Sequence, residues 1–199
     1  MRENLHIHLD PMGGISGDMF IAAMIDADPS LKTLAKSISS KIIKDIELTI
    51  KKSSINHISG TKFAVKLLTK KHNHHRTFND IKKLIEKSVL EEKVKEISIN
   101  IFHELAIAES QIHGVSIKKV FFHEIGAWDS IIDNIIAAAI IHSFASKHQI
   151  TWSCSPIPLG KGSIKTAHGL LSIPALATSI LLKNIPVIDD GIEGERTTP

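Results

Sequence analysis

The stretch FFHEIGAWDSIIDNIIAAA, Phe121–Ala139, decides the fold because it joins a polar motif to the most apolar helix that the sequence predicts. From Ile131 onward, apolar residues cover nearly every face of a helix, which is typical of a helix buried in a core. Asp133 lies inside this helix, where an unpaired charge would cost roughly several kcal/mol. The stretch therefore predicts a buried helix near residues 129–144. Its carboxylates either tie the backbone together or hold a cation or a polar ligand.

The composition indicates an ordinary globular protein with a mildly basic charge. Of its 199 residues, 43% are hydrophobic and 23% are charged, which is typical of soluble domains. The formal net charge of +3 does not by itself indicate nucleic acid, and 5% aromatic residues without tyrosine supply few rings for stacking single-stranded bases. The sequence shows no apolar leader and no run long enough to span a membrane. We therefore expect a cytoplasmic protein with no nucleic-acid and no membrane partner.

Cys154 is the only cysteine of the sequence, which excludes an intrachain disulfide and a zinc site built on several cysteines. It lies in the stretch WSCS of an expected apolar strand. We therefore predict a buried core thiol rather than a nucleophile.

The spacing of apolar residues predicts a mixture of strands and helices. Alternation in IELTIKK and TKFAVKLL predicts an antiparallel strand pair joined around Asn56–Gly60. Further strands are predicted over residues 5–9 and 150–155, and helices over residues 19–27, 30–44, 78–87, 91–113 and 174–182. The stretch SPIPLGKGSIKTAHG is expected to be loop-rich, and the polar tail to end without a closing element. We therefore expect an α/β (mixed α+β) fold over residues 1–199, with a mixed sheet that includes the hairpin, packed with helices, and a polar histidine-containing insertion at residues 70–77.

The first candidate site is the glycine-rich loop LDPMGGISGDMF between the first strand and the first helix. A turn of this kind aims backbone N–H groups at an anion or a polar ligand. The candidate ligand-binding residues are Asp10, Gly14, Ser16, Gly17 and Asp18. In the alternative interpretation, Asp18 caps the helix and the glycines only make the turn.

The second candidate is the histidine cluster His72, His74 and His75. Imidazoles suit nickel, copper, zinc and cobalt, and a histidine-rich loop captures such ions without a rigid cage. The alternative is a polar loop that happens to contain histidines.

The third candidate combines carboxylates and imidazoles from the middle of the chain. Neither FHELA nor FHEIG matches HExxH, so a zincin is excluded. If the buried helix begins before Asp129, then Asp129 and Asp133 share one face and can grip one cation. If the helix begins at Asp129, as Gly126 favours, that residue is an N-cap and only Asp133 needs explaining. The remaining members of this set are His113, His123 and Glu124.

The fourth candidate is the cationic loop GKGSIKTAHG, which carries Lys161, Lys165 and His168. Its lysines among glycines favour contact with a phosphate group. The alternative is a solvent-exposed loop.

Five segments together resemble the LarC family of nickel insertion proteins. They are LDPMGGISGDMFIAAMID, AESQIHG, FHEIGAWDSIIDNIIAAA, SPIPLGKGSIKTAHGLLSIPA and GIEGERTTP, whose order and spacing fit the family over nearly the whole chain. The sequence departs from the family pattern at Ser172 and Leu176, where prolines are usual. It also stops at Pro199, where the family pattern continues into a second region.

The resemblance implies part of a CTP-dependent nickel chelatase, or cyclometallase, of the lyase class. Such proteins insert Ni²⁺ into pyridinium-3,5-bisthiocarboxylic acid mononucleotide, the precursor of the nickel-pincer cofactor of lactate racemase. The CTP site with its divalent metal belongs to the second region, so we expect no activity without that region and a separate C-terminal half as a partner. A homo-oligomer stays open as a further alternative.

The resemblance and the residue chemistry together give each candidate a role. His72, His74, His75 and His113 bind the metal, and His123 or Glu124 accepts the proton that the pyridinium C–H loses. The glycine-rich loop, Asp129, Asp133 and the cationic loop bind the mononucleotide. Two alternatives remain: a non-catalytic nickel-binding module or half-subunit that acts as a metallochaperone, and a truncated inactive remnant.

Overall fold

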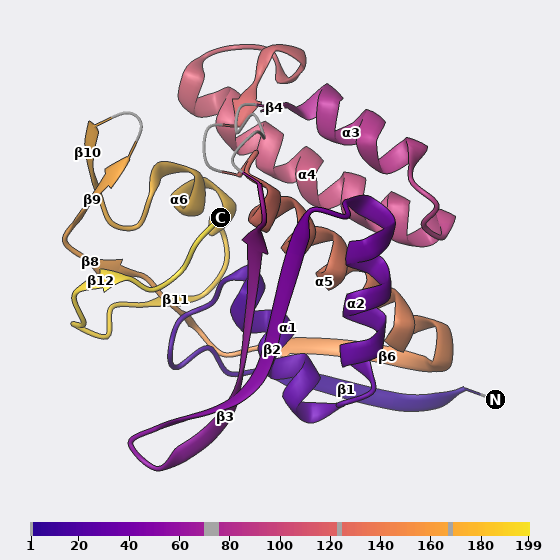
Figure 1. Ribbon diagram of the computed structural model, residues 1–199. Coiled ribbons are helices and arrows are strands. Elements are labelled where there is room, and N and C mark those ends of the chain that lie inside the picture. The colour runs from indigo at the N-terminus through magenta and orange to yellow at the C-terminus, as the bar shows by residue number, and fades with distance from the viewer. Residues whose placement is uncertain (1, 70–75, 123–124, 167–168) are drawn as a thin grey trace.

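The computed structural model describes residues 2–69, 76–122, 125–166 and 169–199 and shows a mixed α/β fold (Figure 1). Its centre is α5 (Trp128–Lys147), in which eight residues are buried. The helices α1 (Gly17–Ala27), α2 (Leu31–Ile42) and α4 (Glu92–His113) all pack against it. The predicted buried helix is thus confirmed, and it extends beyond both of its expected ends.

Local sequence signals explain where several helices begin and end. α3 (Phe78–Lys87) opens on a capping box, because Thr77 and Asp80 each accept a backbone N–H from the other. α4 ends at Gly114, whose left-handed φ of 61° is the conformation that favours glycine.

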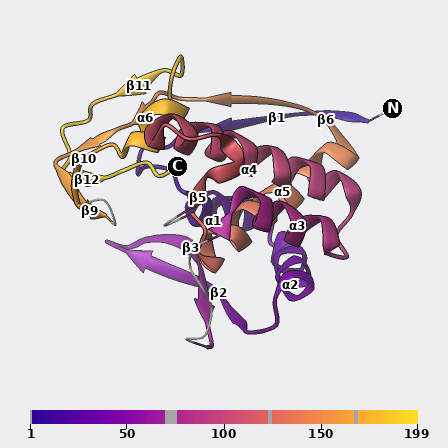
Figure 2. The same cartoon turned by 90° about the horizontal axis from the view of Figure 1, so that it is seen from above.

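The longer strands form two separate pairs in the described part of the chain. β1 (Glu3–Leu9) runs parallel to β6 (His148–Cys154), and β2 (Ile46–Ile55) runs antiparallel to β3 (Ile58–Leu67). The hairpin is confirmed, with a turn tighter than expected. The parallel and antiparallel pairs do not join into one sheet because helices α1 and α5 lie between them and contact both (Figure 2).

The C-terminal part contains more pairing than the sequence predicted. The segment expected to be loop-rich contributes β7 (Ile157–Pro158), β8 (Gly160–Lys161) and β9 (Ser163–Thr166), and the chain continues through β10 (Gly169–Ser172), α6 (Leu176–Leu181), β11 (Val187–Ile188) and β12 (Gly194–Glu195). β12 pairs with β8, and Thr197 bridges to Ile15. The tail is therefore fixed to the glycine-rich loop, contrary to the expectation of an open end. Two further short strands, β4 (Arg76–Thr77) and β5 (Phe121–Phe122), pair beside α3.

Cys154 is exposed, so the prediction of a buried thiol was wrong. It is the last residue of β6, in a sheet of only two strands, where few neighbours cover the strand end. Among the helices that the structure describes, none is both long enough and apolar enough to cross a membrane.

Candidate functional site

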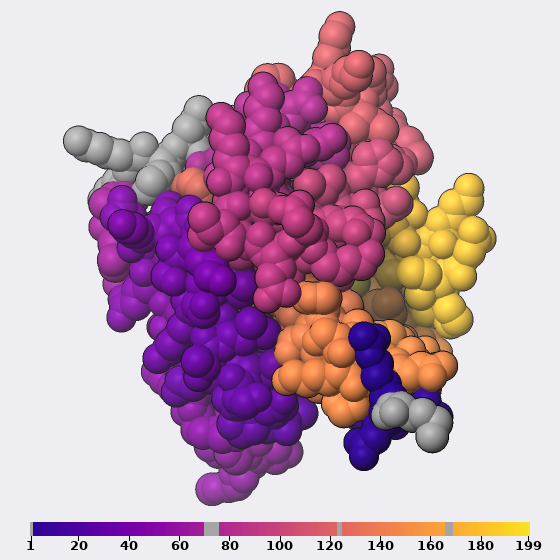
Figure 3. Space-filling model, turned by 90° about the vertical axis from the view of Figure 1, so that its right-hand side faces the viewer, coloured from indigo at the N-terminus to yellow at the C-terminus, as the bar shows by residue number. Residues whose placement is uncertain are grey.

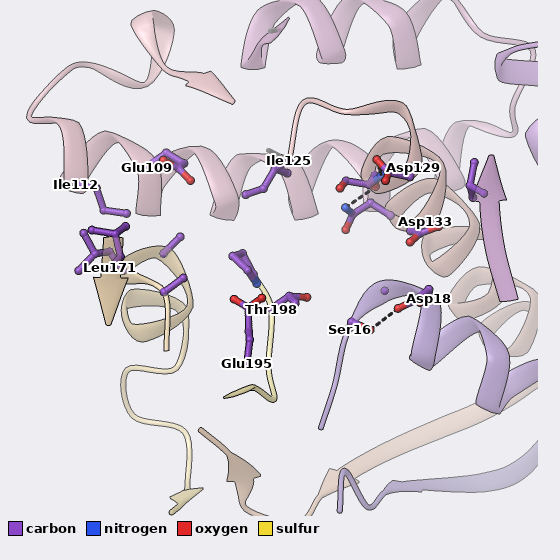
Figure 4. A pocket seen from close by; sticks show the side chains of 18 of the residues that line it. Ser16, Asp18, Glu109, Ile112, Ile125, Asp129, Asp133, Leu171, Glu195 and Thr198 are labelled. Carbon is purple, nitrogen blue, oxygen red and sulfur yellow. Dashed lines mark hydrogen bonds between the residues drawn. The ribbon is translucent and has the colours of Figure 1, made fainter. Parts of the chain in front are cut away.

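A cleft of about 700 Å³ lies where helix ends from different parts of the chain meet the C-terminal segment (Figure 4). The starts of α1 and α5, the end of α4, two neighbouring positions of β3 and the segment from β10 to the tail all contribute to its wall. The polar side chains that line it are Ser16, Asp18, Glu109, His113, Asp129, Ser130, Asp133, Asn134, Glu195 and Thr198.

One end of the cleft is acidic. Asp18 of α1 faces Asp129 and Asp133 of α5 across it (Figure 4). Burial, as the larger cause, and the negative charges of Asp18 and Asp129 together raise the pKa of Asp133 to about 8. The Oδ1 atom of Asp133 is buried and has no hydrogen-bond partner among the described residues. Asp133 is therefore mostly protonated at neutral pH, and a small change in its surroundings can ionise it.

The beginning of α5 settles the alternatives for Asp129. The helix starts at Trp128 with Ala127 as its N-cap, so Asp129 belongs to the first turn. Asp129 and Asp133 are four positions apart and share one helix face, as an early start requires. The N-cap interpretation, which Gly126 favoured, is wrong because the helix begins one residue too early for it.

Asp18 occupies an equivalent place in α1. The N-cap of α1 is Ser16, and Asp18 lies in the first turn. Its Oδ1 atom accepts hydrogen bonds from the Ser16 hydroxyl and, at 2.9 Å, from the N–H of Met19. The carboxylate thus orders the first turn and also reaches the cleft. The interpretation of Asp18 as the helix cap is wrong, because the helix begins two residues earlier, with Ser16 as its N-cap.

The C-terminal segment closes this end of the cleft by binding the glycine-rich loop. The N–H of Ile15 donates to the carbonyl of Arg196 at 2.8 Å, and the N–H of Thr198 donates to the carbonyl of Ile15 at 3.1 Å. The Arg196 guanidinium donates to the carbonyl of Met12 at 2.7 Å. These bonds hold Glu195 and Thr198 beside the cleft, opposite the start of α5 (Figure 4).

The other end of the cleft is partly apolar. Ile112 and Leu171 lie close together there, near α6 (Figure 4). On the same helix as Ile112, the ring of His113 lies 3.3 Å from a carboxylate oxygen of Glu109. The cleft therefore offers carboxylates at one end and an imidazole–carboxylate pair beside apolar side chains at the other.

The structure brings six predicted residues to one place. Ser16, Gly17, Asp18, His113, Asp129 and Asp133 all line the cleft. Asp10, Gly14, Lys161 and Lys165 do not line it, although Gly14 contacts the tail that does. The predictions for His72, His74, His75, His123, Glu124 and His168 concern positions outside the described residues.

Sequence reasoning missed several polar residues of the cleft. Glu109 precedes His113 by one helical turn, so helix spacing alone was a usable signal for this pair. Glu195 and Thr198 carried no such signal, because their position depends on the pairing of the tail with the glycine-rich loop.

The cleft suits acid–base chemistry and the attraction of a cation. No group of three or more histidine, cysteine or acidic side chains within the described ranges is arranged to hold a metal ion. A carboxyl group that titrates near neutral pH is, however, the kind of group that transfers protons efficiently. The surrounding carboxylates attract positively charged ligands and oppose anionic ones.

The chain has relatives among known proteins. The sequence model of a family described as nickel insertion proteins matches residues 7–199. The chain is 38% identical to the pyridinium-3,5-bisthiocarboxylic acid mononucleotide nickel insertion protein of Geobacillus kaustophilus, over 97% of the chain and 48% of that protein. It is 39% identical to the protein of the same name from Desulfitobacterium hafniense, over 96% of the chain and 46% of that protein. The chain spans about half the length of the curated relatives it matches, and no solved structure matches it.

Proposed function

The chain belongs to the nickel insertion protein family, and from this premise we propose that it forms the part of a nickel insertase that holds the organic precursor during metal insertion. The precursor is a pyridinium-3,5-bisthiocarboxylic acid mononucleotide, the compound named for two of its relatives. The metal, Ni²⁺, is a substrate that leaves with the product. The finer assignment, to the nickel-pincer cofactor of lactate racemase, rests on the family resemblance.

The charge of the cleft supports a cationic ligand at its acidic end. A pyridinium ring and Ni²⁺ both carry positive charge. Asp18 and Asp129 offer negative charge in a partly buried setting, to which Asp133 adds when it ionises. The phosphate of the mononucleotide is expected to point away from this end. Lys161 and Lys165, which are exposed and do not line the cleft, stay proposals for meeting that phosphate.

The observation that carries the proposal is the raised pKa of Asp133. Forming a nickel–carbon bond on the ring breaks a ring C–H bond, and the proton must leave while its electron pair goes to nickel. Nickel stays divalent, so no oxidant or reductant is needed. Asp133 must be ionised to accept this proton, and the positive charge of a bound pyridinium ring or Ni²⁺ favours its ionised form. With a pKa of about 8, the ionised carboxylate is a stronger base than an ordinary aspartate. We therefore propose Asp133 as the proton acceptor, alongside the earlier candidates His123 and Glu124.

CTP does not fit this cleft. A triphosphate carries several negative charges, and the described polar wall is dominated by carboxylates. We propose, on the family resemblance, that CTP and its divalent metal act in the region that the longer relatives possess, and we derive no step here through them.

A second candidate function is nickel delivery without catalysis. The chain spans about half the length of these relatives, and under this candidate function the chemistry belongs to the other half of their length. In that case the chain binds Ni²⁺ or the precursor and passes it to a partner.

The test is to incubate the purified chain with Ni²⁺ and the mononucleotide, with and without CTP and the C-terminal half of a longer relative, and to detect the nickel complex by mass spectrometry. Catalysis predicts product in at least the reconstituted mixture. The variant Asp133→Asn should then abolish product but retain precursor binding. The matched control Glu96→Gln removes an exposed carboxylate of α4 that pairs with Lys93, and it should leave product formation unchanged. Binding without product in every mixture would favour the delivery function.

A further inference from the structure

The two-stranded sheet of β1 and β6 carries a ladder of imidazole and hydroxyl groups. His6 lies opposite Thr151 and His8 opposite Ser153 in the parallel register. The His6 ring contacts the Thr151 hydroxyl at 2.8 Å and the Ser153 hydroxyl at 2.9 Å. The His8 ring contacts the Ser153 hydroxyl at 2.7 Å and the Ser155 hydroxyl at 3.1 Å. One hydroxyl oxygen, that of Ser153, thus lies between two imidazole rings.

This ladder is on the outer face of the sheet. Residues two apart in a strand point to the same side, so His6 and His8 share one face while Ile7 packs against the core on the other. Both histidines are exposed. The strand pair lies at the margin of the molecule (Figure 2), and Figure 3 shows the indigo N-terminal strand at the surface beside the orange segment. None of the five ladder residues lines the acidic cleft.

We propose that His6 and His8 form a surface site for a borderline divalent cation, such as Ni²⁺ or Zn²⁺, that is separate from the cleft. Nδ1 of His8 and Nε2 of His6 both lie within hydrogen-bond distance of the same Ser153 oxygen. These two contacts, of 2.9 and 2.7 Å, place the nitrogens at most about 5.6 Å apart. Two nitrogens bound to one such ion, each about 2.0–2.1 Å from it, lie about 3 Å apart, so the two rings turn toward each other when the ion binds. The ion would take the position near the Ser153 hydroxyl, which turns away.

The residue types select the class of cation. Imidazole nitrogens prefer nickel, copper, zinc and cobalt, whereas magnesium and calcium prefer carboxylate and carbonyl oxygens. Two protein ligands leave the other coordination positions to water. The site therefore binds more weakly than a closed structural site and exchanges its ion readily, which suits capture and transfer rather than storage.

Another explanation for the ladder is purely structural: the hydroxyls and rings join two strands that have only each other as partners. The two explanations differ in what Ser153 contributes. A structural ladder depends on the Ser153 hydroxyl because it bridges the two rings. A metal site depends on the two rings and gains from the removal of a competing hydrogen bond.

The test starts from the full chain with His72, His74 and His75 changed to alanine, which removes the loop histidines as binding groups. Titration with NiCl₂ by calorimetry should show a binding component that weakens about tenfold or more in His6→Ala and in His8→Ala, since each loses half of the imidazole ligands. His142→Ala is the control, because His142 contacts Glu91 far from this sheet along the chain, and it should leave the component unchanged.

Two further variants separate this site from its alternatives. Ser153→Ala should retain the nickel component while lowering the melting temperature, and circular dichroism checks that each variant is folded. Asp133→Asn should also retain it, which distinguishes this site from the proposed function of the cleft. Absence of a component that depends on His6 and His8, or its loss in Ser153→Ala with the fold intact, would overturn the proposal.

Discussion

Gly17 and Asp133 approach each other so closely that a Cβ atom placed on Gly17 would lie 3.0 Å from the Cβ of Asp133. This contact brings the start of α1 against the face of α5 that carries the acidic side chains. The absence of a side chain at Gly17 is therefore what lets Asp18 and Asp133 share one end of the cleft.

Gly17→Ala is expected to destabilise the protein by about 1–3 kcal/mol, since the added methyl group overpacks a contact between two helices. The free energy of unfolding in urea measures the effect. Gly13→Ala is the matched control, because its Cβ would meet only the flexible end of Met19 at 3.8 Å. Equal stability of the two variants would show that the helices separate at no cost.

Asp133→Asn is expected to stabilise the protein at alkaline pH. Folding raises the pKa of Asp133 from its ordinary value of 3.8 to about 8, so between these values the folded state holds a proton that the unfolded state has lost. The contribution of Asp133 to stability is therefore highest below the unfolded pKa and falls as the pH rises, by at most about 1.4 kcal/mol per pH unit. It levels off above about pH 8.

The measurement for this prediction is the difference in unfolding free energy between Asp133→Asn and the unchanged protein, at about pH 5 and about pH 8. The difference should grow in favour of the variant toward pH 8, and groups common to both proteins cancel. A difference that does not vary with pH would mean that Asp133 titrates like an exposed aspartate. A residue that lowers the stability of the folded protein near neutral pH is typical of a functional site, where activity requires it despite its cost in stability.

The sequence allowed the centre of the fold and the acidic end of the cleft to be predicted, for one physical reason. A helix that is apolar on nearly every face is buried on nearly every face, so the local sequence indicates the burial of Asp133. The glycines of the loop likewise indicate that its backbone lies close to another segment, although the sequence does not predict that Gly17 contacts Asp133.

The other features of the fold and the cleft could not be predicted, because they depend on contacts between segments that are distant in the sequence. The tail looked open because its strands contain two residues each, which is too short for a periodic signal. The exposure of Cys154 followed from a sheet with only two strands, whereas the local sequence resembled a core strand. Glu195 lines the cleft because the tail pairs with β8 and with the glycine-rich loop.

The neighbouring carboxylates should control the pKa of Asp133. Asp18→Asn and Asp129→Asn each remove a negative charge that raises this pKa, so each is expected to lower it toward its ordinary value. Burial is the larger cause, so the pKa should stay raised in both variants. Carbon-detected NMR titration of the Asp133 carboxyl measures this directly, with Glu96→Gln as the control. If neither variant moves the titration, then the three carboxyls are too well screened to act as one group.

Gly14 is expected to decide whether the tail stays bound to the cleft. Its φ is +109°, and a Cβ would lie 2.0 Å from the backbone oxygen of Arg196. Gly14→Ala should therefore break the hydrogen bond from the N–H of Ile15 to that oxygen and release the tail. Gly162→Ala is the matched control, since its φ of +106° imposes similar backbone strain while its surroundings are open. Amide hydrogen exchange should then increase strongly at Ile15 and Thr198 in Gly14→Ala and little in Gly162→Ala. Equal exchange in both would mean that backbone strain, rather than the close approach of Gly14 to Arg196, sets the stability of this end of the cleft.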